Sequence, residues 1–194
     1  MRIIGGDAKG RTIYSPKQRQ MRPTSDGIKE SLFNILHALC GKSLVDLFAG
    51  SGNVGLEALS RGASKVIFVE KNAVMVNAIK RNLRELSFGG EYEILAVEAA
   101  KSIRKLQNRG ESLDFLFADP PYERGFVRDI FHSLSGGNIL SEDGVLIIQH
   151  SVRENVDEHY TGDFILTDRR RYGDTHLSFF KIREREYKEQ IWGN

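Results

Sequence analysis

Cysteine is nearly absent from this chain of 194 residues, in which Cys40 is the only one. A single cysteine excludes an internal disulfide, and it excludes a zinc site built from several cysteines of one chain. The five histidines have neither the i, i+4 helical pairing nor the short spacing that metal ligands show. The sequence therefore predicts a protein that binds no metal.

Long apolar runs are absent as well. No stretch approaches the roughly 20 apolar residues that a membrane-spanning helix needs. Residues 1–20 lack the apolar core of a secretory signal peptide. Hydrophobic residues make up 40% and charged residues 28% of the chain, which is ordinary for a globular protein. These features predict a cytoplasmic protein without a membrane partner.

The chain also lacks a large net charge, since its formal charge is +2. A value this small says little about a polyanionic partner, but the distribution of charge says more. Residues 1–22 carry six basic side chains against one acidic side chain, Asp7. Such an arm suits contact with phosphates, and a solvated arm without a partner is the alternative.

Apolar periodicity predicts an alternation of strands and helices from residue 44 onward. This alternation produces parallel strands with helices on both faces of a doubly wound α/β sheet. The predicted strands cover residues 44–49, 65–70, 92–97, 113–118 and 144–149, and the predicted helices cover 53–61, 72–86, 100–109 and 126–134.

The start of the chain departs from this alternation. Two short β-prone pieces around glycine-rich turns predict a small N-terminal hairpin, followed by a loop. Thr24 or Ser25 can then cap a helix whose apolar residues run from Ile28 to Leu39, and Gly41 stops it.

The end of the chain also differs. Residues 164–172 and 176–182 are β-prone and are joined by Gly173 and Asp174, which predicts an antiparallel hairpin. The chain then divides into three parts: a basic arm over residues 1–22, one α/β domain over 23–185 and a tail over 186–194.

The segment VDLFAGSGNVG places Gly50, Gly52 and Gly55 in the G-x-G-x-x-G arrangement, after a strand and at the start of a helix. Glycines there allow a tight turn and a close approach of the backbone to a ligand. Glu70 ends the next predicted strand, where its carboxylate can accept both hydroxyls of an adenosine ribose. Asp46 can receive the ammonium group of S-adenosylmethionine or orient the loop, whereas a dinucleotide pyrophosphate gains nothing from its charge. A purely structural turn is the alternative.

A second motif, Asp-Pro-Pro-Tyr, follows the fourth predicted strand at residues 119–122. Its position predicts that it lies at the same edge of the sheet as the glycine turn. The Asp119 carboxylate and the Pro120 carbonyl can each accept one N–H of an exocyclic amine, and Tyr122 offers a face on which an extruded base can stack. Pro121 helps to make the loop rigid. An ordinary strand-ending turn is the alternative.

Together these motifs resemble the bacterial 16S rRNA guanine-N2 methyltransferase family, the RsmD type, across most of the chain. The glycine loop and the DPPY tetrapeptide belong to amino-methyltransferases generally, whereas the two segments nearest the N-terminus are far more specific. In chain order the matching segments are RIIGGDAKGR, RPTSDGIKESLFNIL, DLFAGSGNVGLEALSRGA, the pair Glu70 and Lys71, DPPY and RRYGDTHLSFF.

The resemblance implies a Rossmann-like class I methyltransferase, with a mostly parallel sheet of seven strands and an antiparallel last strand. It implies S-adenosylmethionine as methyl donor and a guanine of 16S rRNA as acceptor. Because one small domain has little surface for recognising a long sequence, we expect an assembled or assembling small subunit as the substrate.

The resemblance also assigns roles to particular residues. Asp119, Pro120, Pro121 and Tyr122 would form the catalytic loop. The cofactor would contact Asp46, Phe48, Ala49, Gly50, Ser51, Gly52, Gly55, Glu70, Lys71, Glu98 and Ala99. Arg22, Pro23 and Thr24, with Arg2, Lys9 and Arg11 of the arm, would lie near the amino-acid end of the cofactor or the RNA.

Two positions depart from the pattern of the family. Glu98 stands before Ala99 where Asp or Asn is more usual, and this departure concerns the exact contact with the adenine. Gln149 stands where an acid is common after the fifth strand. Neither departure touches the methyl-transfer reaction.

Other functions remain as alternatives. The acceptor could be adenine or cytosine in DNA, another RNA or a protein glutamine, because an amide resembles a base amine. A nicotinamide-dependent oxidoreductase would use the same glycine turn, but the sequence has no Tyr-x-x-x-Lys pair for hydride chemistry. A non-catalytic RNA-binding module is a third class. The basic arm favours RNA.

Overall fold

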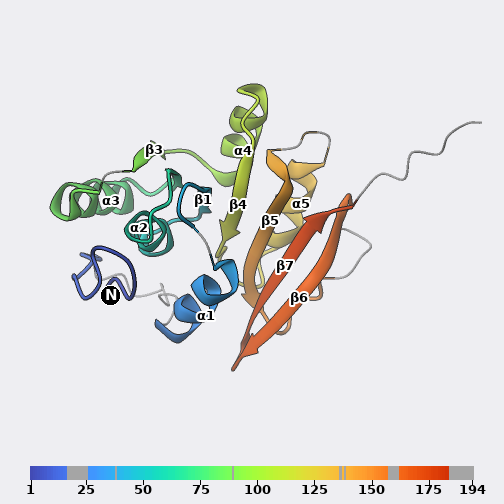
Figure 1. Cartoon of the computed structure of the whole chain (residues 1–194). Coiled ribbons are helices and arrows are strands. Elements are labelled where there is room, and N and C mark those ends of the chain that lie inside the picture. Colours follow the sequence, from blue (N-terminus) through green and yellow to red (C-terminus); the bar gives the residue numbers. More distant parts are fainter. Residues whose placement is uncertain are drawn as a thin grey trace, which may run out of the picture.

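The computed structural model describes residues 1–16, 26–37, 39–88, 90–135, 137, 139–156 and 162–183. Strands and helices alternate along this part of the chain up to the fifth strand (Figure 1). The strands are β1 (Ser43–Leu47), β2 (Lys65–Val69), β3 (Glu91–Leu95), β4 (Leu113–Ala118), β5 (Leu140–Ser151), β6 (Phe164–Tyr172) and β7 (Thr175–Ile182). The helices are α1 (Asp26–Leu36), α2 (Asn53–Ser60), α3 (Ala73–Leu86), α4 (Ala99–Asn108) and α5 (Phe126–Leu134).

The strands form one sheet of seven in the order β3-β2-β1-β4-β5-β7-β6. Strands β1 to β5 pair in parallel, while β7 lies antiparallel to both β5 and β6. The chain order reverses between β1 and β4, and this is the point where α/β sheets bind their ligands. The predicted Rossmann-like fold, with its terminal antiparallel hairpin, is confirmed.

Apolar side chains form two cores, one on each face of the sheet. Helices α1, α2 and α3 pack on one face, and helices α4 and α5 on the other. Alternation along β4 shows this division, because Phe117 faces the first core while its neighbours Leu116 and Ala118 face the second. Both faces are therefore covered, as a parallel sheet requires.

The N-terminal hairpin is present but short. Arg2 and Thr12 form a single antiparallel bridge. Ile3 and Ile13, next to the bridge, are buried in the core that α1, α2 and α3 share. The arm is therefore packed against the domain over its described residues, and the division into arm, domain and tail stays a prediction.

Helix α1 is shorter than its apolar pattern predicts. It ends at Leu36 instead of continuing to Gly41, because His37 adopts a left-handed backbone with φ 42°. Leu39 is still buried, from the turn that follows. The capping residues proposed for this helix, Thr24 and Ser25, lie outside the described residues.

Strand β5 is longer than predicted, because it begins at Leu140 instead of residue 144. Residues 141–143 are polar, so their sequence has no apolar alternation by which to recognise a strand. Their pairing is also irregular, with a register shift between Leu113 and Phe115 of β4. The tail predicted at residues 186–194 lies outside the described residues.

Candidate active site

The glycine turn, the predicted ribose acid and the DPPY loop meet at one edge of the sheet. Leu47, the last residue of β1, pairs with Val69 of β2 on one side and with Ala118 of β4 on the other. Phe48, Glu70 and Asp119 are therefore the next residues of three adjacent strands. The predicted meeting of these motifs is confirmed.

Three residues of the turn have a left-handed backbone: Phe48 (φ 69°), Gly50 (φ 56°) and Gly52 (φ 86°). Phe48 carries a side chain in this unfavourable region, and its ring meets Phe126 of α5 edge to face at 5.6 Å. This contact joins the glycine turn to the helix that follows the DPPY loop.

Backbone and side-chain hydrogen bonds hold the rest of the turn. The Ala49 amide donates to the Val69 carbonyl at 2.9 Å. The Ser51 carbonyl accepts a bond of 3.1 Å from the Asn82 side chain of α3. Asn82 also bonds both backbone groups of Tyr14, so it connects the turn to the N-terminal arm. The sequence pattern contained no sign of this role.

Gly55 lets helix α2 lie close to the sheet. A Cβ at this position would come within 2.3 Å of the Phe68 ring of β2. Phe68 is fully buried, so the ring has no space into which to move. Gly55 is therefore needed for the close packing of α2 against β2. Glycine fingerprints have this packing role in addition to letting the backbone approach a ligand.

Asp46 orients the glycine loop. The residue is 2% exposed, and its Oδ2 accepts a bond of 2.9 Å from the Gly55 amide. Burial raises the pKa of Asp46 to about 7, although the Gly55 bond opposes the rise. Two roles were predicted for Asp46, and the bond to Gly55 corresponds to the one in which it orients the loop.

Glu70 fixes the turn from the next strand. Its Oε2 accepts a bond of 2.9 Å from the Gly50 amide, and its Oε1 accepts one of 2.8 Å from the Asn72 amide. A carboxylate oxygen has a second lone pair, so each can still accept a ribose hydroxyl. Glu70 is thus pre-oriented beside the turn.

Beside Glu70, an open hollow of about 540 Å³ reaches to the start of α4. Lys71 and Glu98 form an exposed ion pair of 3.4 Å across it, and Ala99 is the first residue of α4. The hollow suits adenosine chemically: carboxylates accept from ribose hydroxyls and from the adenine amine, and Val97 offers an apolar surface. It is lined by Lys71, Asn72, Ala96, Val97, Glu98 and Lys101.

The DPPY loop leaves β4 with Pro120 buried and Pro121 exposed. The half-buried Tyr122 hydroxyl contacts Thr175 Oγ1 at 3.2 Å and accepts a bond of 3.0 Å from Gln149 Nε2. Burial raises the pKa of Tyr122, and the charge of Asp119 raises it further. The ring of Tyr122 is therefore held at its far end by two strands, β5 and β7.

Glu123, directly after the loop, also has a left-handed backbone, with φ 59°. Its Oε1 accepts a bond of 3.0 Å from Ser151 Oγ at the end of β5. Strain of this kind in a non-glycine residue is typical of functional loops, and here the bond to β5 stabilises it.

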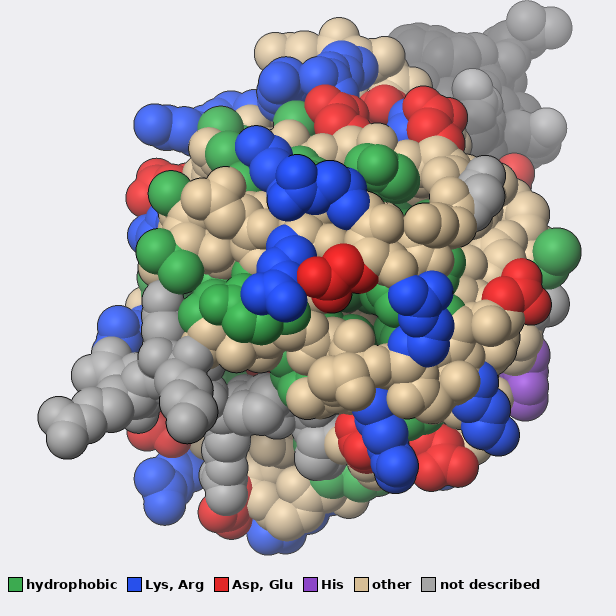
Figure 2. Space-filling view, turned by 90° about the vertical axis from the view of Figure 1, so that its left-hand side faces the viewer, with side chains coloured by type: hydrophobic (Ala, Val, Ile, Leu, Met, Phe, Trp, Pro, Cys, Tyr) green, Lys and Arg blue, Asp and Glu red, His purple; other side chains and the backbone are tan. Residues whose placement is uncertain are grey.

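Two of the arm residues predicted to bind RNA, Arg2 and Arg11, have partners within the protein. Arg11 donates to the Leu86 carbonyl at 3.2 Å and to the Glu85 carbonyl, so it caps the end of α3. Arg2 pairs with Asp26 at 3.3 Å, and Lys9 is exposed. On this face, basic side chains are spread among acidic and apolar ones (Figure 2). Arg22, Pro23 and Thr24 lie outside the described residues.

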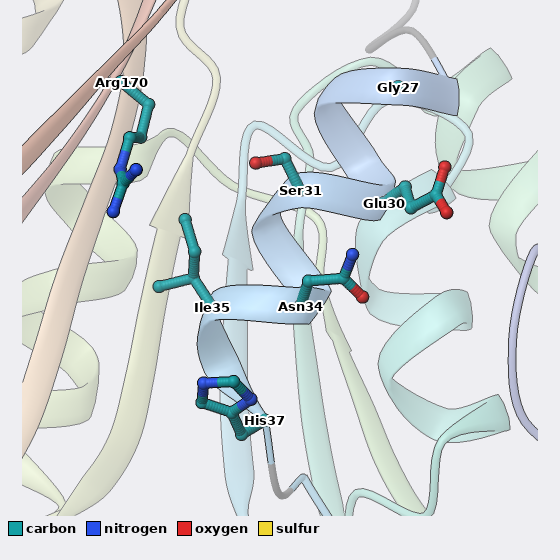
Figure 3. A pocket seen from close by; sticks show the side chains of 7 residues that line it. All are labelled: Gly27, Glu30, Ser31, Asn34, Ile35, His37 and Arg170. Carbon is teal, nitrogen blue, oxygen red and sulfur yellow. The ribbon is translucent and has the colours of Figure 1, made fainter.

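A second hollow, of about 510 Å³, lies between α1 and β6 (Figure 3). Arg170 extends from β6 toward α1, and its Nε donates to Asp168 at 2.8 Å. None of the residues predicted to form the site lines this hollow. Its lining consists of Gly27, Glu30, Ser31, Asn34, Ile35, His37 and Arg170.

The sequence predicts the absence of a membrane-spanning helix and of a metal site. Within the described ranges, no helix is long and apolar enough to cross a membrane. The same residues contain no group of three or more His, Cys, Asp or Glu side chains that could hold a metal ion. The metal-free site stays a prediction.

The sheet with its antiparallel β7, the glycine turn fixed by Glu70 and the DPPY loop on the adjacent strand define a class of protein. It is the class of Rossmann-like methyltransferases, whose methyl donor is S-adenosylmethionine.

Comparison with known proteins narrows the class. A family model described as "Conserved hypothetical protein 95" matches residues 1–181. The ribosomal RNA small subunit methyltransferase D of Escherichia coli (strain K12) is 31% identical, over 80% of this chain and 77% of its own. YlbH of Bacillus subtilis (strain 168), provisionally named an rRNA methyltransferase, is 32% identical over 94% and 100%.

A solved structure supports the same class of protein. The protein yhhF from Escherichia coli, provisionally named a methyltransferase, has a TM-score of 0.80 and 27% identity, covering 95% of this chain and 99% of its own. The chain belongs to the family of conserved hypothetical protein 95, the RsmD-type methyltransferases. The resemblance stated from the motifs is confirmed.

Proposed function

We propose that this protein transfers a methyl group from S-adenosylmethionine to the exocyclic N2 of a guanine in 16S rRNA. The observation that carries the proposal is the row formed by the glycine turn, Glu70 and Asp119 at the ends of β1, β2 and β4. The relatives named as small-subunit rRNA methyltransferases support the choice of substrate.

The cofactor half of the site would hold S-adenosylmethionine through groups that the protein has already oriented. Glu70 would accept the ribose hydroxyls, and Glu98 would accept the adenine amine in the hollow beside α4. The backbone of Gly50 to Gly52 would lie against the amino-acid part. Once bound, the cofactor supplies an electrophilic methyl group.

The acceptor half would prepare the amine. An exocyclic amine is a poor nucleophile, because its lone pair is delocalised into the ring. The Asp119 carboxylate and the Pro120 carbonyl would each accept one N–H, which favours a pyramidal nitrogen with its lone pair available. The proton that the methylated nitrogen loses would pass to the Asp119 carboxylate or to water. Tyr122, anchored by Gln149 and Thr175, would stack on the extruded base.

The RNA would be part of a small ribosomal subunit, assembled or still assembling. Of the arm residues, Lys9 is exposed and suits phosphate contact, whereas Arg2 pairs with Asp26 and Arg11 is engaged at the end of α3. The cytoplasmic location predicted from the sequence follows from this substrate.

The test is transfer of labelled methyl from S-adenosylmethionine to small subunits and to naked RNA from cells lacking the protein, followed by mapping of the modified nucleoside. We expect N2-methylguanosine in small-subunit RNA with the wild type, formed about 10²–10⁴-fold more slowly with Asp119→Ala. Label in adenine, in DNA or in protein would contradict the proposed acceptor. Equal transfer to naked RNA and to subunits would contradict the preference for an assembled particle.

A further inference from the structure

Gln149 lies beside the catalytic loop with one end of its amide unpaired. The side chain is 3% exposed, and its Nε2 donates to the Tyr122 hydroxyl at 3.0 Å. Its Oε1 is buried and has no hydrogen-bond partner within the described part of the chain. A buried carbonyl oxygen without a donor is costly, so such an atom needs an explanation.

The position of the amide suggests what would pair with it. Gln149 of β5 pairs with Leu177 of β7, and Ser151 pairs with Thr175, so Gln149 and Thr175 project from the same face of the sheet. Both reach the hydroxyl of Tyr122. The unpaired Oε1 therefore lies at the phenol end of the ring on which the base would stack.

The chemistry of the bases identifies the missing donor. Base-modifying enzymes recognise the Watson–Crick edge of the extruded base by hydrogen bonds. Guanine has a ring N1–H directly beside its 2-amine, so this edge carries donors in succession. Adenine and cytosine have a ring nitrogen acceptor beside the amine instead. Acceptors from Asp119, Pro120 and Gln149 match guanine alone among these three bases.

On this basis, and resting on the proposed function, we infer that Gln149 determines the specificity for guanine: its Oε1 accepts the N1–H of the target base while its Nε2 holds Tyr122. With adenine or cytosine, the lone pair of the ring nitrogen would face Oε1, which would leave both acceptors unpaired. The specificity would thus come from a residue outside the DPPY motif.

The test compares two bases in reconstituted small subunits, at the guanine mapped by the methyl-transfer experiment. One substrate carries guanine there, and the other carries 2-aminopurine, which keeps the 2-amine but lacks N1–H. Single-turnover rates are measured at saturating S-adenosylmethionine. Gln149→Met, similar in length but without the amide, should lower the guanine to 2-aminopurine rate ratio about tenfold, as expected for the loss of one buried hydrogen bond.

Thr175→Val is the matched control, because it removes the other contact of the Tyr122 hydroxyl and leaves Gln149 in place. It should slow both substrates by the same factor. Gln149→Glu retains an acceptor and should keep the preference for guanine. Calorimetric binding of S-adenosylmethionine and a cooperative melting transition show that each variant is folded.

If Gln149→Met slows both substrates equally, as Thr175→Val does, the inference is overturned, and Gln149 only positions Tyr122. A loss of the preference in Gln149→Glu would overturn it as well. Guanine would still be methylated in either case, so the proposed function would stand. Absence of label on guanine with the wild type would instead contradict the proposed function itself.

Discussion

The two halves of the site are built in different ways. The cofactor half is local: the glycine turn and Glu70 follow consecutive strands and are joined by one bond of 2.9 Å between Gly50 and Glu70. The acceptor half is assembled from distant parts of the chain, since Tyr122 is held by Gln149 of β5 and Thr175 of β7. A local motif can be recognised in sequence, whereas an assembled pocket requires the topology.

The largest effect on stability is expected at Gly55, where the cofactor half of the site depends on close packing. Gly55→Ala would bring a Cβ to 2.3 Å from the buried Phe68 ring. Overpacking of this kind costs about 1–3 kcal/mol, so we expect that loss in the free energy of unfolding and weaker binding of S-adenosylmethionine. Urea unfolding and calorimetry measure the two effects.

Gly27→Ala is the control for this prediction. Gly27 lies in α1, where an added Cβ meets no atom within 4 Å. Alanine at such a helical position should stabilise the protein slightly and leave cofactor binding unchanged. If both substitutions had the same effect, the close approach of α2 to β2 would have no special importance.

The buried carboxyl of Asp46 predicts a pH dependence. Its pKa rises from 3.8 to about 7 in the folded protein. Between these values the folded state retains a proton that the unfolded state has lost, so stability falls as the pH rises. Asp46→Asn keeps an acceptor for the Gly55 amide and removes this titration. The unfolding free energy should then fall less steeply, by up to about 1.4 kcal/mol per pH unit.

Urea unfolding across this pH range tests the prediction. Parallel profiles for wild type and Asp46→Asn would mean that Asp46 titrates at its ordinary value and that its burial has no electrostatic consequence.

The smallest effect concerns the arm, where one basic residue is engaged and another is exposed. Arg11→Ala should lower the free energy of unfolding by about 1 kcal/mol, because the end of α3 loses its cap, and should leave RNA binding unchanged. Lys9→Ala should leave stability unchanged and weaken binding to small-subunit RNA, with a smaller salt dependence. Reversed results would show that Arg11 turns to the RNA.

Most of the fold could be predicted from the sequence, because apolar alternation indicates strands and helices directly. The apolar pattern gave the wrong bounds where polar residues or the local backbone conformation decide the structure. The left-handed His37 ends α1 early, and the polar start of β5 showed no strand pattern. Neither feature appears in the spacing of apolar residues.

Buried polar groups were the other limit of prediction. Ile28 begins the apolar series of α1, but its neighbour Lys29 is the residue that is fully buried. Lys29 pairs with the equally buried Glu57 of α2 at 3.2 Å and donates to Asn53 at 2.9 Å. Such a network depends on how α1 packs against α2, and the sequence pattern does not reveal this packing.

The residues of the site show the same difference between local motifs and contacts that depend on the fold. The glycine turn, Glu70 and the DPPY loop were predicted, because each follows a recognisable strand. Gln149 stood out in the sequence only as a departure from the family pattern, and Thr175 only as one residue of the matching segment RRYGDTHLSFF. Both act through the register between β5 and β7, which no local motif records.

The central claim is that the two halves divide the work, one holding the cofactor and the other activating the amine. Calorimetric S-adenosylmethionine affinity and methyl-transfer rate, measured together for Glu70→Ala and Asp119→Ala, test it most directly. We predict that Glu70→Ala weakens binding at least about tenfold, with transfer largely restored at saturating cofactor. Asp119→Ala should bind the cofactor normally and transfer methyl about 10²–10⁴-fold more slowly. Loss of cofactor binding in Asp119→Ala, or normal transfer by it, would contradict the claim.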